Sequence, residues 1–201
     1  MSLLFAKNNS LSAITELPAS VSGGGLNLIS SQTASSSSTI DFTSGIDSTY
    51  KEYIFKFYDI HPASDVVNFT FNMSIDSGSN YNVTKTTTFF DAIHSESGSD
   101  SSVNYSSSRD LAQSTDFQML ARQIGNDNDQ STSGTLHLFE PSSTTFVKHF
   151  ISNFNSYYSE NYSMNHYVAG YGNTSSSVDA VQFKMSSGNI DSGIIKLFGV
   201  T

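Results

Sequence analysis

Histidine is the side chain best suited to bind a metal or to move protons near neutral pH, and its five copies are scattered through this sequence. No two of them stand in the H-x-H or H-x-x-x-H spacing that brings two imidazoles to one ion. Cysteine is absent, which excludes a thiolate nucleophile, a disulfide and a Cys-ligated metal. We therefore expect no metal site, no cofactor and no catalytic residue, and we interpret the following histidines as surface or packing residues: His61, His94, His137, His149 and His166.

Carboxylates are more numerous, with Asp and Glu together at 18, but most of them stand in turns. A glycosidase needs two facing carboxyl groups about 5 to 9.5 Å apart, and the sequence alone leaves such a pair open. The turn Asp127–Ser131 matches the first three alternate positions of a helical calcium loop. Thr132 and Leu138 then replace the Gly and Glu that this loop requires, so it fails as that motif, and weak calcium binding by an oxygen-rich turn stays open.

Tyrosine and asparagine gather between residues 153 and 171. Tyrosine offers a large apolar area with a polar tip, which suits contacts with carbohydrate or with a protein partner. One interpretation is therefore a glycan- or partner-binding surface, and the commoner alternative is a set of ordinary strand aromatics. The tyrosines concerned are Tyr157, Tyr158, Tyr162, Tyr167 and Tyr171.

Composition and charge limit the partners. The net charge is −9 and the pI is near 4.7, whereas nucleic acid and anionic lipid are bound by basic patches. No window holds the 18 or so apolar residues of a membrane span. We expect neither nucleic acid nor a membrane as a partner.

Period-2 alternation of apolar and polar residues dominates from residue 26 onward. In the stretch 67–76, Val, Phe, Phe, Met and Ile alternate with polar residues that we expect to face solvent, and 81–91 reads as its hairpin partner. Tyr53, Phe55 and Phe57 share one face of a strand that is apolar on both sides. About ten strands at this spacing predict an all-β domain over 26–201, a two-sheet antiparallel β-sandwich that is jelly-roll-like.

The last 24 residues, from Val178 to Thr201, read as a terminal hairpin. Val181, Phe183 and Met185 fall on one face of its first strand, a turn rich in Gly, Asn and Asp follows, and an apolar strand ends the sequence. We expect that strand to lie inside the sheet, so that changes at Phe183, Leu197 or Phe198 destabilise the fold.

Residues 1–25 differ from the rest, with scattered apolar side chains and a closing Gly triplet. We interpret this stretch as an extended arm that anchors the domain elsewhere; a frayed terminus or an added strand is the alternative. The arm residues expected to dock are Leu3, Leu4, Phe5, Leu11 and Ile14.

Three stretches carry a family resemblance: Ile40 to Tyr50 (IDFTSGIDSTY), Tyr53 to Phe57 (YIFKF), and Asp179 to Gly193 continued by KLFG. They resemble a widespread group of structural proteins of tailed bacteriophages, notably phages of marine bacteria and cyanobacteria. The resemblance spans about residues 26–201 and rests on turns and strands, so no site residue carries over.

The resemblance implies a non-enzymatic virion protein: a tail-fibre, head-fibre, adaptor or decoration module made in the host cytoplasm and exposed on the particle. Its implied partners are other virion proteins and further copies of itself, with a trimer as one arrangement. A carbohydrate- or receptor-binding module of a tail fibre, reaching a host surface glycan, is the alternative. A polysaccharide depolymerase is a third and weaker hypothesis.

Overall fold

The computed structural model describes residues 25–201, which form strands and turns without a helix. These residues accordingly offer no helix that is long and apolar enough to cross a membrane. The strands are β1 (Leu26–Ser37), β2 (Ile40–Phe42), β3 (Glu52–Pro62), β4 (Val67–Ser74), β5 (Lys85–Ser95), β6 (Ser101–Tyr105), β7 (Gln118–Ile124), β8 (Thr132–Phe139), β9 (Lys148–Tyr158), β10 (Tyr162–Gly172), β11 (Ala180–Met185) and β12 (Ile190–Val200).

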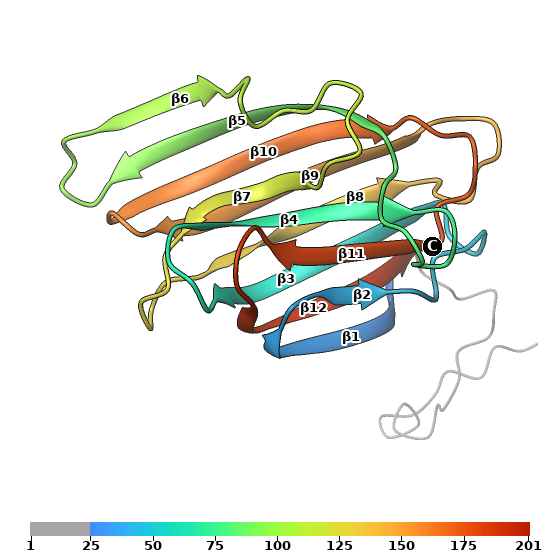
Figure 1. The fold of residues 1–201 in the computed structure, drawn as a ribbon, viewed down its shortest axis with the longest axis horizontal. Coiled ribbons are helices and arrows are strands. Elements are labelled where there is room, and N and C mark those ends of the chain that lie inside the picture. Colours follow the sequence, from blue (N-terminus) through green and yellow to red (C-terminus); the bar gives the residue numbers. More distant parts are fainter. Residues whose placement is uncertain (1–24) are drawn as a thin grey trace, which may run out of the picture.

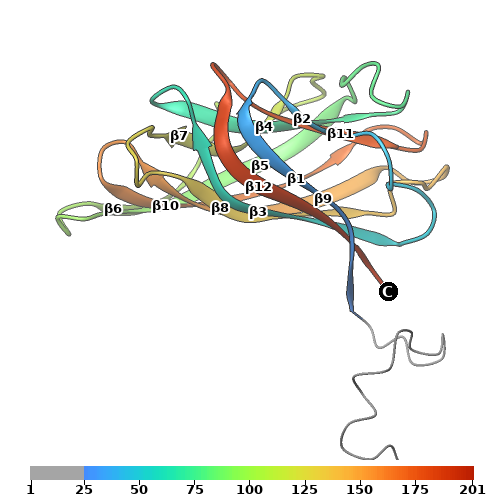
Figure 2. The ribbon, with the colours of Figure 1, turned by 90° about the horizontal axis from the view of Figure 1, so that it is seen from below.

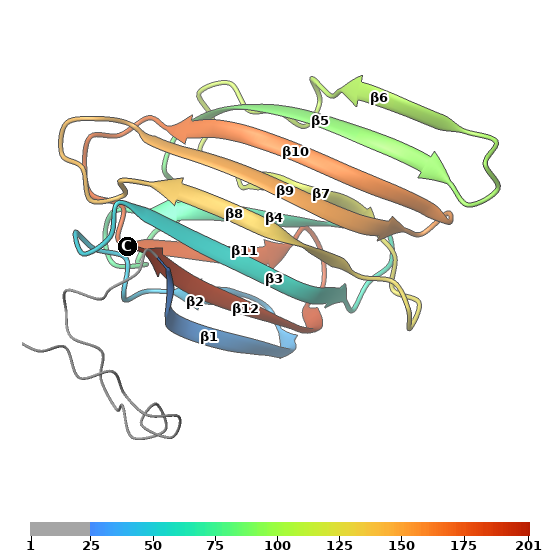
Figure 3. The ribbon, with the colours of Figure 1, turned by 180° about the vertical axis from the view of Figure 1, so that it is seen from behind.

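All strand pairs are antiparallel and belong to one continuous network (Figure 1). The larger layer has the order β1-β12-β3-β8-β9-β10-β5-β6, and Figure 3 shows it in front. The smaller layer, β7-β4-β11-β2, lies over the larger one in Figure 2. We call the face of the larger layer that is turned away from the smaller one the outer face.

The two layers are connected along both sides. On one side, β7 of the smaller layer pairs with β9 of the larger one through Ile124 and Tyr158. On the other side, where the strand path begins with β1 and ends with β2, the side-chain amide of Gln32 in β1 donates to the carbonyl oxygen of Asp41 in β2 at 2.5 Å. The sheet is thus nearly closed into a barrel. The prediction of an all-β antiparallel fold is confirmed, with twelve strands in place of about ten.

Aromatic side chains fill the space between the layers. Tyr53, Phe55 and Phe57 of β3 are buried on one face, as the alternation predicts. Phe183 of β11 packs against them, with its ring centroid 5.2 Å from that of Phe55 and 5.0 Å from that of Phe57. Both contacts are edge-to-face, the geometry that the ring quadrupole favours.

The expected terminal hairpin is wrong. β11 and β12 do not pair with each other: β11 lies between β4 and β2, and β12 lies between β3 and β1. The turn around Gly188, which has φ +69°, carries the chain from the smaller layer to the larger one. Each strand is apolar and is paired on both of its edges in these positions. The last strand does lie inside the sheet.

β4 also differs from the prediction. It pairs with β7 and β11 and not with the segment after it, because that segment crosses to the larger layer and becomes β5. Its polar residues were expected to face solvent, yet Asn72 is fully buried. The Asn72 amide donates to the carbonyl oxygens of Tyr81 and Thr115 at 2.7 and 2.9 Å. Two later segments therefore cover this side of β4.

The arm residues lie outside the described part of the chain, so the anchor stays a prediction. Gly25, the first described residue, lies beside the last one. Its amide donates to the Thr201 hydroxyl at 3.3 Å, and the Thr201 amide donates to the Gly25 carbonyl at 3.4 Å. The preceding residues are thus joined to the domain next to its C-terminal end.

We predict that Phe183→Ala lowers the free energy of unfolding by about 3 to 5 kcal/mol, because it removes a ring that five buried phenylalanines contact. Phe198→Ala is the matched control. Phe198 lies partly exposed on the outer face, which corrects its expected core position, so we expect less than half of that loss. Urea unfolding of both variants measures the difference, and equal losses would contradict it.

Candidate functional site

The outer face of β5, β10 and β9 carries most of the tyrosine- and asparagine-rich segment. The register places Tyr167 of β10 beside Phe90 of β5 and Asn153 of β9. The Tyr167 and Phe90 rings stack at 5.0 Å with an interplanar angle of 13°. Both side chains are about 40% exposed, Tyr167 at 39% and Phe90 at 40%. This stack forms a flat aromatic platform open to solvent.

Three hollows follow one another along β10. The first, of about 440 Å³, is lined by Thr86, Thr88, His149, Phe150, Ile151, Ala169, Gly170 and Tyr171. The second, of about 150 Å³, lies beside the Phe90–Tyr167 stack. The third, of about 270 Å³, is lined by His94, Ser95, Glu96, Asn155, Ser156, Tyr157, Tyr162 and Ser163. We call this part of the outer face, which follows β10 and includes the three hollows and the Phe90–Tyr167 stack, the strip. At roughly 3.3 Å per residue the strip is about 30 Å long, which is enough for an extended ligand.

The five predicted tyrosines do not share one face. Tyr157, Tyr167 and Tyr171 occupy alternate positions that point to the outer face. Tyr158 and Tyr162 pair with each other across β9 and β10 and pack together at 5.8 Å. Tyr162 still lines the third hollow, because it stands at the end of its strand. The strip is thus a surface of mixed aromatic and polar side chains with fewer tyrosines than the sequence suggested.

Hydrogen bonds fix the polar side chains of the strip. Asn165 donates to the Tyr167 hydroxyl at 2.7 Å, and Asn153 donates to the Asn165 side-chain oxygen at 2.9 Å. The Tyr157 hydroxyl donates to the Asn161 side-chain oxygen at 3.2 Å, and interaction with the nearby Glu96 carboxylate raises the pKa of this hydroxyl. Such preset donors and acceptors beside an aromatic platform can recognise hydroxyl-rich ligands.

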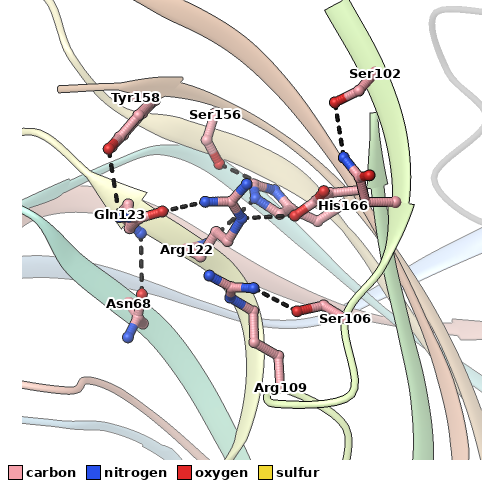
Figure 4. A network of polar contacts seen from close by, with 11 residues as sticks. Asn68, Ser102, Ser106, Arg109, Arg122, Gln123, Ser156, Tyr158 and His166 are labelled. Atoms are coloured by element: carbon pink, nitrogen blue, oxygen red, sulfur yellow. Dashed lines mark hydrogen bonds and ion pairs between the residues drawn. The ribbon is translucent and has the colours of Figure 1, made fainter. Parts of the chain in front are cut away.

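A second polar cluster lies on the inner side of the same strands (Figure 4). The Arg122 Nε of β7 donates to the Asp91 carboxylate of β5 at 2.6 Å, and the Asp91 side chain is only 2% exposed. The Arg122 backbone N–H faces the His166 Nε2 of β10 at 3.4 Å. The His166 Nδ1 lies 3.5 Å from the Ser156 hydroxyl of β9. This cluster ties the smaller layer to three strands of the larger one.

A bulge in β7 aims Arg122 at this cluster. Between the pairs Val67–Ile124 and Phe69–Ala121, two residues of β7 oppose the single residue Asn68. One of the two, Gln123, has φ +52°, a left-handed value that costs free energy for a residue other than glycine. The Asn68 side-chain oxygen accepts the Gln123 backbone N–H at 3.0 Å and supports the bulge. Bulges commonly redirect a side chain in this way.

The inner cluster is what sequence reasoning missed. His166 was expected at the surface or in packing, and the structure buries it fully. Burial is the main cause that lowers the pKa of its imidazole to about 4. Asp91 opposes it across β5 and β10. The alternation could have predicted the burial of both residues. Asp91 stands two positions after Phe89, and His166 stands two positions from Met164 and Val168, so each lies on the buried face of its strand. The bulge that delivers Arg122 had no comparable signal.

The sequence also did not indicate that two lysines, Lys85 and Lys148, are buried. The Lys85 ammonium donates to the Asn72 side-chain oxygen at 2.6 Å and to the Val83 carbonyl at 2.8 Å, and burial lowers its pKa to about 7. The Lys148 ammonium donates to the carbonyls of Phe146 and Thr174 at 2.7 and 3.1 Å, and burial lowers its pKa too. Both amines hold loop carbonyls at the end of the domain near Thr201.

The acidic turn lies beside one histidine, His61. The His61 Nε2 is 3.2 Å from the Asp127 carbonyl oxygen, and His61 lines a hollow of about 440 Å³ together with Asp59, Asp129 and Asp191. In the turn, the Gln130 N–H donates to the Asp127 carbonyl at 2.9 Å, which accounts for it as local turn chemistry. Within residues 25–201, no three His, Cys, Asp or Glu side chains are arranged to hold a metal ion. The five histidines lie on five different strands: β3, β5, β8, β9 and β10.

We predict that the domain loses stability as the pH falls from 6.5 toward 4. Unfolded His166 takes up a proton near 6.5, whereas the folded state, where the ring faces Asp91, Arg122 and Arg109, does so only near pH 4. The unfolded state therefore binds more protons in this window, and the loss amounts to at most about 3 kcal/mol.

Urea unfolding between pH 7 and pH 4.5 tests this. His166→Gln should flatten the slope between pH 6.5 and 5, where carboxyl groups contribute least. His149→Gln, on the exposed outer face, is the matched control and should keep the slope. An unchanged slope in His166→Gln would refute the assignment.

No protein-family model, curated protein or solved structure gives a match to this chain. The expectation of a phage virion protein therefore stays a prediction that depends on the sequence resemblance.

Proposed function

We propose that this protein is a non-enzymatic structural protein of a phage particle, a fibre, decoration or adaptor module attached through its N-terminal segment. The observation that carries the proposal is the adjacency of Gly25 and Thr201, which joins residues 1–24 to one end of the domain. The turns at the opposite end of the domain lie away from Gly25. We further interpret the layered sheet as a flattened β-sandwich of jelly-roll type.

The segments that carry the resemblance support this proposal because they meet in space. β2, within the first segment, pairs with β11, within the last: Phe42 opposes Val181 and Ile40 opposes Phe183. The Phe42 ring also lies 5.2 Å from that of Phe55, within the second segment. A shared pattern in three contacting segments is what a common fold requires. The proposal therefore concerns a whole structural module.

We predict that deletion of residues 1–22 leaves a folded domain and abolishes incorporation into virus particles. Particles from infected cultures that supply the full-length or the shortened chain in trans, each with the same C-terminal tag, can be purified and probed by immunoblot. Far-ultraviolet circular dichroism of the shortened chain checks its β content. If purified particles contain equal amounts of the full-length and the shortened chain, attachment through the N-terminal segment is refuted.

The second candidate is a carbohydrate-binding module, and the strip along β10 favours it. Its aromatic platform and its side-chain amides are exposed together on a rigid sheet. A sugar ring presents an apolar face and several hydroxyl groups, so it can stack on Tyr167 while its hydroxyl groups bond to Asn153 and Asn165. Binding of a host glycan is compatible with a place in a tail fibre.

We predict that Tyr167→Ala or Tyr171→Ala weakens glycan binding about 2- to 13-fold each, which corresponds to about 0.5 to 1.5 kcal/mol per aromatic contact. Tyr58→Ala is the control, since Tyr58 is 42% exposed on β3, away from the strip. A glycan array followed by calorimetry on any hit measures the effect. Absence of binding at millimolar sugar, or equal loss in all three variants, would reject this candidate.

A further inference from the structure

β6 is an edge strand with nothing beside it. It pairs only with β5, and Figures 1 and 3 show no other described strand beyond it. The remaining edge of β5 is covered, because the Lys85 and Thr87 amides donate to the carbonyls of Ser114 and Leu111 at 2.8 and 2.9 Å. The open part of this edge is therefore Ser101–Tyr105.

This edge lacks the usual protection against pairing. Natural edge strands carry charges, proline or bulges that prevent a second strand from docking. β6 reads Ser-Ser-Val-Asn-Tyr, with no charge and no proline, and its register with β5 has no shift. β1, the other edge of the larger layer, has a register shift between Leu28 and Ser30 and a left-handed residue at Ser36. β6 is thus the better template for an added strand.

The free backbone groups of β6 can be identified from the ladder. Ser95 donates to the Asp100 carbonyl and Ser106 donates to the Phe89 carbonyl, both at 2.9 Å. In an antiparallel pair, hydrogen-bonded residues alternate with residues whose N–H and C=O point away. Ser102 and Asn104 therefore bond to β5. The groups that point outward belong to Ser101, Val103 and Tyr105.

We propose that the protein forms a two-fold symmetric dimer in which β6 pairs antiparallel with β6 of a second copy. With the axis at Val103, all three outward-pointing residues fall in hydrogen-bonded pairs: Val103 opposite itself, and Ser101 opposite Tyr105. Ser102 faces Asn104 in the closer, non-hydrogen-bonded pair. Within one chain the Asn104 amide already donates to the Ser102 hydroxyl at 2.7 Å, so the same groups can bond across the axis. The strand is self-complementary in shape and polarity.

Charge and exposure favour a second copy as the occupant. The protein carries −9, so two copies repel unless they meet where charge is sparse. Ser101–Tyr105 contains no charged residue, and the carboxylates beside it are those of Asp100, which precedes the strand, and Asp110, which accepts a hydrogen bond from the Tyr105 hydroxyl. Val103 is 73% exposed and Tyr105 58% exposed, and both lie on the outer face with Phe90. Pairing about this axis shields them and continues the outer face from one copy to the next. The proposal holds whether or not the protein is part of a virus particle.

The test uses the full chain in sedimentation-velocity runs over a concentration series at two salt concentrations. We expect a concentration-dependent dimer that strengthens with salt, because salt screens the repulsion. Val103→Pro removes an outward donor without removing a bond to β5, and it should raise the dissociation constant at least about tenfold. Val103→Thr keeps the donor and should behave as the unmodified chain does. Circular dichroism confirms that both variants fold.

A cross-link gives a second, independent readout. Residues opposite each other in a hydrogen-bonded pair have Cα atoms about 5.5 Å apart, within the range that a disulfide spans. The chain has no cysteine, so oxidation of Val103→Cys should yield a covalent dimer rapidly, and oxidation of Ser35→Cys on β1 should not. A monomer at all concentrations, an unchanged dissociation constant in Val103→Pro, or equal cross-linking of the two cysteine variants would overturn the proposal. If β6 instead pairs with a strand of a different protein, the purified chain should remain a monomer at all concentrations.

Discussion

Packing of phenylalanine rings around Phe183, edge-to-face with the rings of the larger layer, is the interaction on which the rest of the structure depends. Phe183 belongs to the smaller layer, and its neighbours Phe55 and Phe57 belong to the larger one. After β11, which carries Phe183, the chain leaves the smaller layer and enters the larger layer as β12. That crossing prevents a terminal hairpin, places β12 between β1 and β3, and brings the last residue beside Gly25.

The unequal size of the two layers creates the other features. The larger layer continues through β10, β5 and β6, and the smaller layer ends at β7. On the inner side, β7 bulges at Gln123 and sends Arg122 to the Asp91 carboxylate, which leaves a charged pair and a neutral histidine in a buried position. We expect this buried pair to contribute more to defining one arrangement of strands than to net stability, because desolvation of the two groups offsets most of their attraction.

On the outer side the same strands present a continuous surface. Its aromatic platform, its amide groups and the edge strand β6 lie on one face and follow each other across the sheet. A dimer through β6 would place two such strips side by side. Two linked strips would bind a repeating ligand more tightly than one, because the second contact becomes intramolecular. Self-association and recognition of a glycan or a neighbouring protein are therefore compatible uses of one face.

The sequence by itself determined the local structure. Alternation at Tyr53, Phe55 and Phe57, and again at Phe69 and Phe71, identifies strands and their buried faces, because side-chain direction in a strand follows from sequence position alone. The sequence also pointed to Tyr157, Tyr167 and Tyr171 of the strip, but not to Phe90, whose ring stacks on Tyr167.

Only the tertiary structure decided which strands are neighbours and what lies on each side of them. Asn72 and His166 carry polar side chains whose burial depends on distant segments that supply their partners. Strand pairing and the β7 bulge depend on contacts between residues far apart in the chain. The alternation of apolar and polar residues does not predict such contacts, because the same alternation occurs in an edge strand, in a hairpin and in a strand that follows a crossing between layers.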